Sequence, residues 1–305
     1  MEWLENWSPI LSDRLIFICT KYPSFKVIDI FPFENELSET IDATVFAQSY
    51  LIQPSLFLRI RPGKKKTVTD KLLMHHIVYE EIAQDCFAIT NTTKIDTIIE
   101  LNKEAVIQDY SSQRIKEFLD PQIINYKSAM KVWDCCAASG GKSILVIDMP
   151  GKTDLTVSDI RPAILNNLKK RFKEAGIKKF NSFISDVTIK SYNIPYSPFD
   201  LIICDAPCSG SGTWGRTPEQ LAYITTEKIL EYAALQKKII AGTIIHLNTE
   251  GYFLYITCSV FKKENEDAVK FICDNYNMKI IKQELLKGYN KKADTMFAAL
   301  FTRNA

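Results

Sequence analysis

Histidine is scarce in this sequence, and the cysteines lack the spacing of a metal site. There are three histidines, two of them adjacent at His75-His76, and none of the eight cysteines forms a C-x-x-C pair. Structural zinc is held by such pairs and by histidines, so we expect no metal. Without that role, the cysteines are expected to be free thiols, as in a cytoplasmic protein.

Long apolar runs and a strong net charge are also missing. No stretch approaches the ~20 apolar residues of a membrane span, and the first five residues lack the basic start of a signal peptide. We therefore expect a cytoplasmic monomer without a membrane partner. The formal charge is only +2, but residues 1–55 carry 3 basic and 8 acidic groups, whereas residues 131–305 carry 24 and 18. That asymmetry is compatible with nucleic acid at the C-terminal part, or with an ordinary solvated surface.

The 305 residues are 46% hydrophobic, enough for more than one domain. Residues 1–55 are expected to form a short helical segment around Trp3, Trp7, Leu11 and Leu15, with no readable function. Residues 56–120 predict a small α+β (RRM-like) module, and residues 121–305 a Rossmann-like domain.

In the module, LFLRIRPGKKK from residue 56 reads as a strand that enters a basic turn. A helix is predicted over 67–79, strands over 86–89 and 105–108, and a helix over 111–119 that ends at Asp120-Pro121. Such a module can present a sheet or a basic turn to RNA. Its basic cluster could bind phosphates or be a solvated hairpin tip; its members are Arg59, Arg61, Lys64, Lys65 and Lys66.

Beyond residue 120, strands and helices alternate, which predicts a parallel sheet. The predicted strand 131–136 leads into the glycine turn AASGGK, which opens a helix. The next strand, 156–159, ends in Asp159, with Pro162 at the start of the following helix. A strand over 180–184 is followed by Asp186. Acids thus recur at the carboxyl ends of strands, where open α/β sheets bind ligands.

The stretch DLIICDAPCSGSG, from Asp200 to Gly212, is the centre of this arrangement. Its apolar run predicts a buried parallel strand that ends in Asp205 and is followed by Cys208. A second apolar strand, GYFLYITCSV over 251–260, carries Cys258 near its end. Two cysteines at the ends of two strands predict a site.

The ligand suggested by this pattern is a nucleoside without a bound phosphate chain. A strand, a glycine turn, a helix, a strand and an acid form a nucleotide-binding unit. However, the sequence has no G-x-G-x-x-G, and Cys136 stands where a Walker A motif ending at Gly141-Lys142 needs glycine. S-adenosyl-L-methionine is the obvious candidate.

These motifs together resemble the Sun/Fmu family of RNA cytosine-5 methyltransferases over residues 56–305. The matching segments are QDYSSQ (108–113), DCCAASGGK (134–142), the spaced acids Asp159 and Asp186, DAPCSGSG (205–212), TCSV (257–260) with the Glu264-Asn265-Glu266 that follows, and DTMFAALF (294–301). The family turn usually reads AAPGGK. Ser139 replaces its proline, which removes no ligand group.

The resemblance implies roles for the residues at the matching positions. Asp159 would bind the cofactor's ribose, Asp186 its adenine side, and Asp205 would lie between cofactor and base. The methionine end would be held by the turn Cys136, Ala137, Ala138, Ser139, Gly140, Gly141 and Lys142.

Carbon 5 of cytosine is a poor nucleophile, and addition of a thiolate to carbon 6 activates it. By resemblance, Cys258 forms that bond, Cys208 assists release, Asp205 holds the ring, and Lys142 adds positive charge. Arg216 is a further expected RNA contact. The expected function is cytosine-5 methylation of ribosomal RNA; the alternatives are transfer RNA as substrate, or a non-catalytic RNA-binding or assembly factor.

Overall fold

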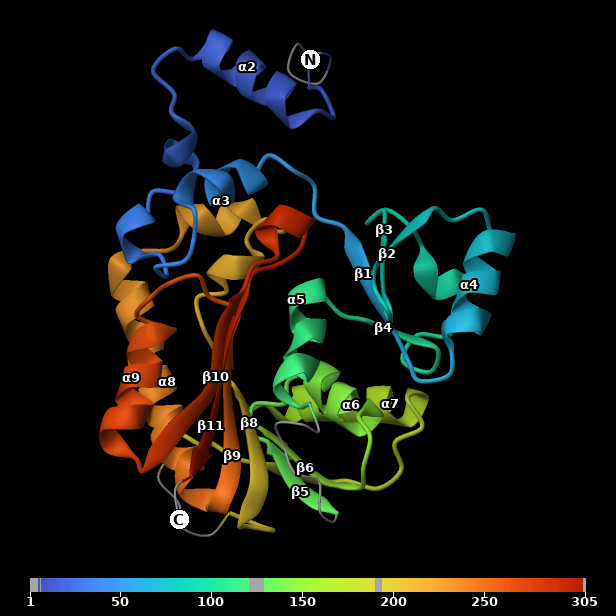
Figure 1. Cartoon of the computed structure of the whole chain (residues 1–305), viewed down its shortest axis with the longest axis vertical. Helices are drawn as coiled ribbons and strands as arrows, with labels where there is room; N and C mark the ends of the chain where they lie inside the picture. Colours follow the sequence, from blue (N-terminus) through green and yellow to red (C-terminus); the bar gives the residue numbers. More distant parts are fainter. Residues whose placement is uncertain (1–4, 6, 121–128, 190–193, 304–305) are drawn as a thin grey trace.

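The protein is described here by a computed structural model that covers residues 5, 7–120, 129–189 and 194–303. Figure 1 shows a large domain with helices on both sides of a sheet, a small module beside it, and an N-terminal segment above it. The larger sheet has seven strands in the order β10-β11-β9-β8-β5-β6-β7, and the smaller has four in the order β2-β3-β1-β4.

The helices are α2 (Leu11–Lys21), α3 (Ala43–Ser49), α4 (Lys65–Met74), α5 (Tyr110–Gln113), α6 (Gly141–Asp148), α7 (Pro162–Glu174), α8 (Thr226–Thr243) and α9 (Glu266–Asn275). The strands are β1 (Leu56–Ile60), β2 (Tyr79–Ala83), β3 (Cys86–Ile89), β4 (Ala105–Ile107), β5 (Met130–Asp134), β6 (Thr153–Asp159), β7 (Asn181–Ile184), β8 (Phe199–Asp205), β9 (Leu247–Thr257), β10 (Met278–Leu286) and β11 (Met296–Arg303).

Five neighbouring strands of the large sheet are parallel, from β7 to β9, and the β10–β11 hairpin pairs antiparallel with β9. The helices α6 and α7 cover one face and α8 and α9 the other (Figure 1). This is the Rossmann-like fold that the alternation of strands and acids predicted.

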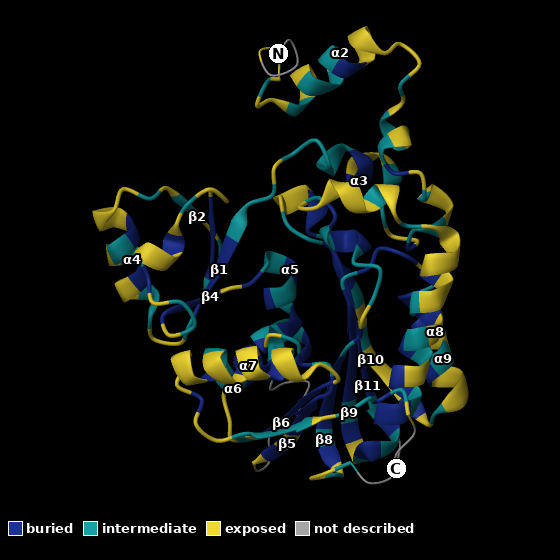
Figure 2. Cartoon of the chain, turned by 180° about the vertical axis from the view of Figure 1, so that it is seen from behind, coloured by how far each residue is buried: buried dark blue, intermediate teal, exposed yellow. Residues whose placement is uncertain are grey.

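The two faces of the sheet have separate apolar cores because successive side chains of a strand point to opposite faces. In β8, Leu201 and Ile203 pack with α6 and α7, whereas Ile202 and Cys204 pack with α8 and α9. Trp133 of β5 is fully buried on the second face. Figure 2 shows the buried strands between helices whose outer surfaces are exposed. Burial on both faces explains why these strands read as continuous apolar runs.

The small module is an antiparallel sheet covered by α4. It is fixed to the large domain by Arg59 of β1 and by Arg61, just after β1, which both bind Asp148 at the end of α6. Arg61 also donates to the carbonyl of Ala175, just after α7. The module and the α6–α7 side of the domain are thus joined by buried charge pairs.

The N-terminal segment packs on the loops that follow β8 and β9. Phe31 stacks on Phe261 with ring centroids 6.0 Å apart, and the Ser38 N–H donates to the Val260 carbonyl at 2.8 Å. Phe46 and Trp214 belong to the same buried cluster. Residues around 31–47 therefore help to hold the loops that carry the two cysteines of interest.

Several predicted elements differ in their bounds. The helix predicted over 67–79 is α4 and stops at Met74; His76 then adopts a positive φ of 55°, and the chain enters β2. The helix predicted over 111–119 is split into α5 and a 3-10 turn, Arg114–Phe118. The strand predicted over 251–260 is β9, which ends at Thr257, so Cys258 lies in the loop after it. Of the segment expected to be helical around Trp3, Trp7, Leu11 and Leu15, the last two lie in α2, Trp7 lies in no helix, and Trp3 lies outside the described residues, as does the stop at Pro121.

Candidate active site

One cavity collects the predicted residues at the carboxyl edge of the parallel strands. It has a volume of about 420 Å³. Because β5, β6, β7, β8 and β9 are parallel, the residues that end or follow them meet at this edge. The cavity is lined by Cys136, Ala138, Asp159, Ile160, Arg161, Ser185, Asp186, Val187, Thr188, Asp205, Ala206, Pro207, Cys208, Leu235, Ile239 and Cys258.

Asp159 ends β6 with its carboxylate fixed by hydrogen bonds. The Ala138 N–H donates to Oδ2 at 3.2 Å, and the Arg161 N–H and Nε donate to Oδ1, each at 2.9 Å. Burial works to raise the pKa of Asp159, but the bonds from Arg161 and Ala138 outweigh it and lower the pKa. The carboxylate is therefore ionised at neutral pH. The Arg161 side chain is 60% exposed, so its guanidinium can move into solvent when its hydrogen bonds to Asp159 break.

The glycine turn brings backbone to the cavity at one point and packs against α7 at another. Ala138 lines the cavity with a φ of 44°, and Ala137 is buried beneath it. Gly140 has a φ of 79°, and a Cβ there would lie 2.6 Å from a ring carbon of Phe172. Only glycine fits that position. The hydroxyl of Ser139, the residue that replaces the family's proline, accepts a hydrogen bond from Arg171 at 3.0 Å.

Asp186 follows β7 and borders the same cavity. Its Oδ1 accepts hydrogen bonds from the Thr188 N–H at 2.9 Å and from the Thr188 hydroxyl at 2.6 Å. These bonds lower the pKa of Asp186.

Asp205 ends β8 and pairs with Lys142 of α6, with Nζ 2.5 Å from Oδ2. Burial works to lower the pKa of Lys142, but the charges of Asp205 and Cys258 outweigh it and raise the pKa. Lys142 is therefore a permanent cation beside both groups. Among the described residues no donor bonds Oδ1 of Asp205, so that oxygen remains able to accept or hold a ligand group.

Asp134, the last residue of β5, is an acid whose importance the sequence did not reveal. It is 1% exposed, and the Ser143 hydroxyl donates to its Oδ2 at 2.6 Å. Its Oδ1 has no hydrogen-bond partner among the described residues. Burial raises the pKa of Asp134 to about 7, with a further contribution from the charge of Asp205.

The two thiols of the cavity come from loops that contact each other. The Cys258 N–H donates to Sγ of Cys208 at 3.3 Å, and the Gly212 N–H donates to the Cys258 carbonyl at 2.9 Å. A Cβ on Gly212 would lie 1.9 Å from the Thr295 carbonyl oxygen, so a larger residue cannot replace it without moving backbone. The interaction with Cys258 and burial both raise the pKa of Cys208, which is therefore a protonated thiol at neutral pH.

Glu264 bridges the two loops that carry Cys208 and Cys258 through hydrogen bonds to its side chain. Its carboxylate accepts hydrogen bonds from the Ser209 N–H at 2.8 Å and the Ser209 hydroxyl at 2.5 Å, from the Ser259 hydroxyl, and from Gln236 Nε2 at 2.9 Å. Ser209 follows Cys208 and Ser259 follows Cys258. Glu264 is fully buried, and burial raises its pKa. The segment Glu264-Asn265-Glu266 was visible in the sequence as a motif, but no local pattern showed which loops it holds.

The basic residues predicted to contact RNA are mostly engaged within the protein. Arg59 is 5% exposed and bound to Asp148, and Arg61 also binds Asp148, so the guanidinium groups that we expected to meet RNA phosphates are held by a carboxylate of the protein itself. Their charges are needed to offset a buried carboxylate, which a strand pattern cannot show. Lys65 binds Glu81 on the module surface. Lys64 borders a groove, and Lys66 is exposed on α4.

Arg216 is likewise held in ion pairs within the protein. It bridges Asp109 and Asp294, each at 2.8 Å, and donates to the Ser55 carbonyl. These ion pairs engage the charge that we expected to face RNA, while the side chain remains 31% exposed. Arg216 instead ties the loop after Gly212 to the segments QDYSSQ and DTMFAALF.

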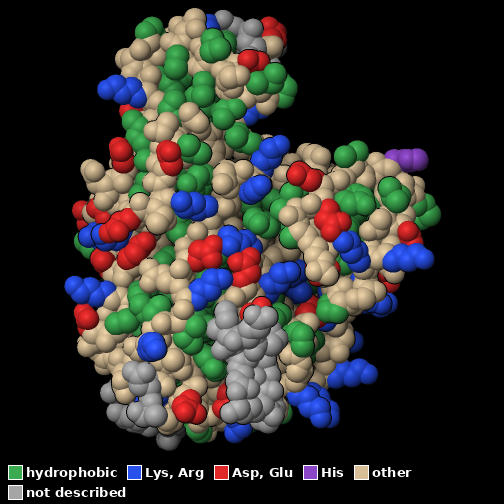
Figure 3. All heavy atoms as spheres, in the orientation of Figure 1, with side chains coloured by type: hydrophobic (Ala, Val, Ile, Leu, Met, Phe, Trp, Pro, Cys, Tyr) green, Lys and Arg blue, Asp and Glu red, His purple; other side chains and the backbone are tan. Residues whose placement is uncertain are grey.

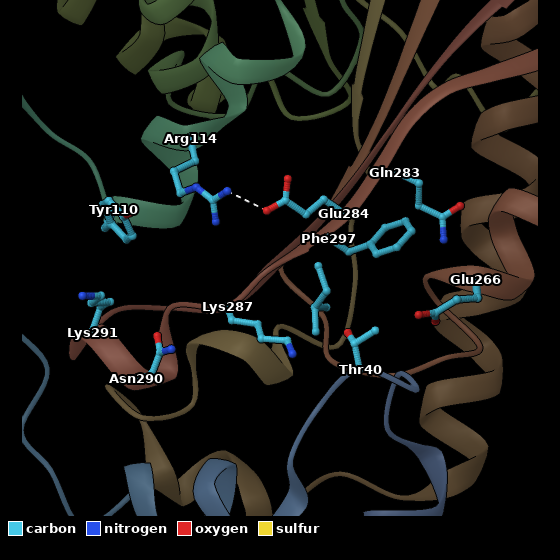
Figure 4. Close-up of a pocket in the computed structure, with 11 residues that line it drawn as sticks. Thr40, Tyr110, Arg114, Glu266, Gln283, Glu284, Lys287, Asn290, Lys291 and Phe297 are labelled. Carbon is cyan, nitrogen blue, oxygen red and sulfur yellow. Dashed lines mark hydrogen bonds and ion pairs between the residues drawn. The ribbon is translucent and has the colours of Figure 1, made fainter. Parts of the chain in front are cut away.

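A second hollow, of about 580 Å³, lies at the β10 edge of the large sheet (Figure 4). Figure 4 shows Arg114 and Glu284 directed toward each other across it, and their ion pair measures 2.6 Å. Tyr110 and Lys287 lie at its sides. It contains no thiol and its central charges are paired, so it lacks the groups that the first cavity assembles.

The described residues hold no group of three or more side chains placed to bind a metal ion. Among the same residues, no helix is long and apolar enough to cross a membrane.

Comparison with known proteins identifies the family. The profile described as 16S rRNA methyltransferase RsmB/F matches residues 121–301, more than half of the chain. The chain belongs to this family. The resemblance read from the motifs is thereby confirmed, and the cavity lies inside the segment that the RsmB/F family shares.

Two curated relatives of this RsmB/F chain illustrate the match. Ribosomal RNA small subunit methyltransferase B of Salmonella agona is 32% identical over 171 residues, which are 54% of this chain and 37% of that protein. Probable ribosomal RNA small subunit methyltransferase B of Bacillus subtilis is 28% identical over 225 residues, 72% of this chain and 49% of that protein. The chain spans less than half the length of these relatives.

Solved structures share the fold over nearly the whole RsmB/F chain. A methyltransferase homolog protein from Pyrococcus horikoshii has a TM-score of 0.70 at 19% identity and covers 97% of this chain and 99% of that one. NSun6 from the same organism, solved with SFG, has a TM-score of 0.72 at 14% identity and covers 92% and 97%. At these identities the likeness is one of fold.

Proposed function

We propose that this chain transfers a methyl group from S-adenosyl-L-methionine to carbon 5 of a cytosine in 16S ribosomal RNA. The observation that carries the proposal is that two inequivalent thiols and a lysine-paired aspartate line one cavity in an RsmB/F chain. The two cysteines are in contact, because the backbone N–H of Cys258 donates a hydrogen bond to Sγ of Cys208. A site for simple nucleoside binding has no need of two thiols at its mouth.

The cavity fits the cofactor. Its volume lies in the usual range for small-molecule sites, and its apolar lining includes Ile160, Val187 and Leu235, which suit an adenine ring. Asp159 is ionised, and its oxygens can accept two vicinal ribose hydroxyls once the exposed Arg161 guanidinium moves aside. Asp186 stands at the neighbouring strand end. The cofactor supplies an electrophilic methyl group.

The chain's own residues divide the remaining work. Cys258 Sγ forms a bond to carbon 6 of the cytosine, and the electron pair of the carbon 5–carbon 6 double bond makes carbon 5 nucleophilic. Asp205, held by Lys142, binds the nitrogen 3 edge of the ring and stabilises the adduct. After methylation, the carbon 5 proton passes to solvent water, its bonding pair re-forms the carbon 5–carbon 6 double bond, and Cys258 leaves carbon 6 as a thiolate. Cys208, a protonated thiol beside Cys258, assists this release.

The direct test of the proposal is product formation. The purified chain is incubated with S-adenosyl-L-methionine and 16S rRNA transcript, and the RNA is digested and examined for 5-methylcytidine by mass spectrometry. Bisulfite sequencing of total RNA with and without the gene then locates the cytosine and shows whether it lies in ribosomal or transfer RNA. Cofactor binding without methylation of any RNA would favour a non-catalytic role.

Asp159→Ala tests the cofactor assignment separately. Loss of two hydrogen bonds to a charged acceptor should weaken S-adenosyl-L-methionine binding by ~2 kcal/mol or more, about thirtyfold. Asp154→Ala is the matched control, because Asp154 lies at the other end of the same strand and is exposed. Equal affinities of the two folded variants, measured by calorimetry, would contradict the ribose assignment.

A further inference from the structure

Positive charge is concentrated in one short segment of the large domain. Residues 161–180 contain seven basic side chains and one acidic side chain, although the whole chain has a formal charge of only +2. By contrast, α8 and α9, on the other side of the sheet, contain four basic and five acidic residues. The charge is therefore asymmetric between the two helical layers.

Five lysines of this segment form a continuous exposed surface, the α7 basic face. Helix α7 buries Leu165, Leu168 and Phe172 against the sheet, so the residues between them face solvent. None of the five lysines has an ion pair to any described residue, whereas Lys65 and Lys71 in the small module are each paired with a glutamate. The α7 basic face comprises Lys169, Lys170, Lys173, Lys178 and Lys179.

A groove continues this face toward the small module. It has a volume of about 680 Å³, and it lies between the turn after β1 and the end of α7. Lys173 and Lys64 both border it, from opposite sides. Two carboxylates also line it: Asp148 is paired with Arg59 and Arg61, and Glu174 accepts a hydrogen bond from Asn102. Lys103, a third lysine of the groove, is paired with Glu100, which leaves Lys64 and Lys173 without an ion pair to described residues. In Figure 3, Lys and Arg side chains project from this flank, beside α6 and α7.

The position of the face relative to the cavity indicates what it could bind. Helix α7 begins beside Arg161 at the cavity and, with 13 residues, extends about 20 Å away from it. Lys169, Lys170 and Lys173 lie in the last two turns of α7, and Lys178 and Lys179 follow the helix. Such a row of unpaired lysines suits a chain of phosphates better than a single anion. At 3.4 Å for each nucleotide of a stacked strand, about six phosphates cover the length of α7. A small acidic ligand would need convergent rather than linear charge.

We infer that the α7 basic face, together with Lys64, binds the phosphate backbone of the substrate RNA on the side of the cavity away from α8 and α9. The inference rests on the proposed function for its ligand, and it replaces Arg59, Arg61 and Arg216 as the RNA contacts. Such contacts hold the RNA without reading its sequence, since phosphates are the same at every position. The target cytosine is then presented to Cys258 while flanking nucleotides lie along α7.

The experiment compares two triple variants with the same change of charge. Lys169→Ala/Lys170→Ala/Lys173→Ala removes half of the proposed contacts. The control, Lys238→Ala/Lys270→Ala/Lys279→Ala, removes three exposed lysines of α8, α9 and β10 that likewise lack ion pairs to described residues. Both variants and the wild-type chain are titrated with 16S rRNA transcript over a range of salt concentrations. S-adenosyl-L-methionine binding and thermal unfolding are measured to verify the fold.

Removal of three phosphate contacts should flatten the slope of log affinity against log salt by about 2 to 3. We expect this in the α7 triple, with a raised KM for RNA and unchanged kcat, and a slope change of less than about 1 in the control. Equal slopes for the two triples, while the wild-type chain methylates RNA, would overturn the α7 assignment alone. A wild-type chain that neither methylates nor binds RNA would overturn the proposed function and this inference together.

Discussion

Asp134 offers a quantitative test of how burial controls the protonation of an acid at the edge of the site. The change is Asp134→Asn, which keeps the shape of the side chain and removes its titration. The carboxyl is 1% exposed, has one hydrogen-bond donor in Ser143, and has an Oδ1 without a partner among the described residues. Burial raises its pKa from an ordinary value of 3.8 to about 7.

A carboxyl whose pKa is raised by folding binds its proton more tightly in the folded state. Its favourable contribution is complete below its unfolded pKa and is lost as the pH rises toward the folded pKa. At 1.36 kcal/mol for each pH unit, the loss reaches about 4 kcal/mol above pH 7, of which about 2.5 kcal/mol falls between pH 5 and pH 8. The asparagine variant escapes this loss, but it leaves an amide N–H₂ without an acceptor, which costs about 1–3 kcal/mol.

The assay is chemical denaturation of both proteins at several pH values between about 5 and 8. We expect Asp134→Asn to gain about 2.5 kcal/mol relative to the wild-type chain across this range, so that it is the less stable protein at the acid end and equal or more stable at the alkaline end. Other titrating groups are common to both proteins and cancel in the difference. Asp274→Asn, which makes the same substitution at an exposed position on α9, is the control for the change of charge. Parallel stability curves for Asp134→Asn and wild type would refute the argument that burial controls this acid.

Three further predictions address the cysteine loops. Cys258→Ala should abolish methylation and leave no covalent RNA complex, whereas Cys208→Ala should accumulate an RNA adduct that survives denaturing electrophoresis; an adduct with Cys258→Ala and none with Cys208→Ala would reverse the two roles. Glu264→Ala should lower the free energy of unfolding by about 3 kcal/mol or more, because four hydrogen-bond donors lose their acceptor, and Glu264→Gln should lie between it and the wild-type chain. The denaturant midpoints of the variants measure this. An alanine variant as stable as the wild-type chain would contradict the bridging role. Gly212→Ala should lower the free energy of unfolding by about 1–3 kcal/mol, because its Cβ would clash with the Thr295 carbonyl. Gly215→Ala is the control in the same loop: the nearest atom to its Cβ is 3.7 Å away, so this variant should unfold at nearly the wild-type temperature. Equal unfolding temperatures of the two variants would show that the loop accommodates the Gly212 Cβ at no cost.

The cavity could be predicted from the sequence because its parts obey local rules. Apolar runs covered on both faces read as parallel strands, and parallel strands bring the residues after them to one edge. Asp159, Asp205 and Cys258 could therefore be placed together without any knowledge of distant contacts. The exact ends of β9 were predicted less well, because a strand's end depends on the pairing of β9 with β8 and β11.

The β10–β11 hairpin and the covering N-terminal segment were not predicted. The eight-residue strand β11 is almost entirely buried only because β9 and β10 pair with it on both sides. Phe31 is buried by Phe261, which lies 230 residues further along the chain. Local patterns carry no record of such partners.

Electrostatic roles were decided by the tertiary structure alone. Arg59 and Arg61 read as solvent-facing cations, but Asp148, nearly ninety residues later, binds both of them inside a domain junction. The lysines of α7 remain unpaired among the described residues because no acidic segment folds against them. Asp134 is one acid among many in the sequence, and it acquires a pKa of about 7 only because the folded sheet buries it. The sequence alone determined the parallel strands of the large sheet, the glycine turn and the side chains that reach the cavity. Charge and protonation depend on burial and on the nearest opposite charge, which exist only after distant segments have packed together.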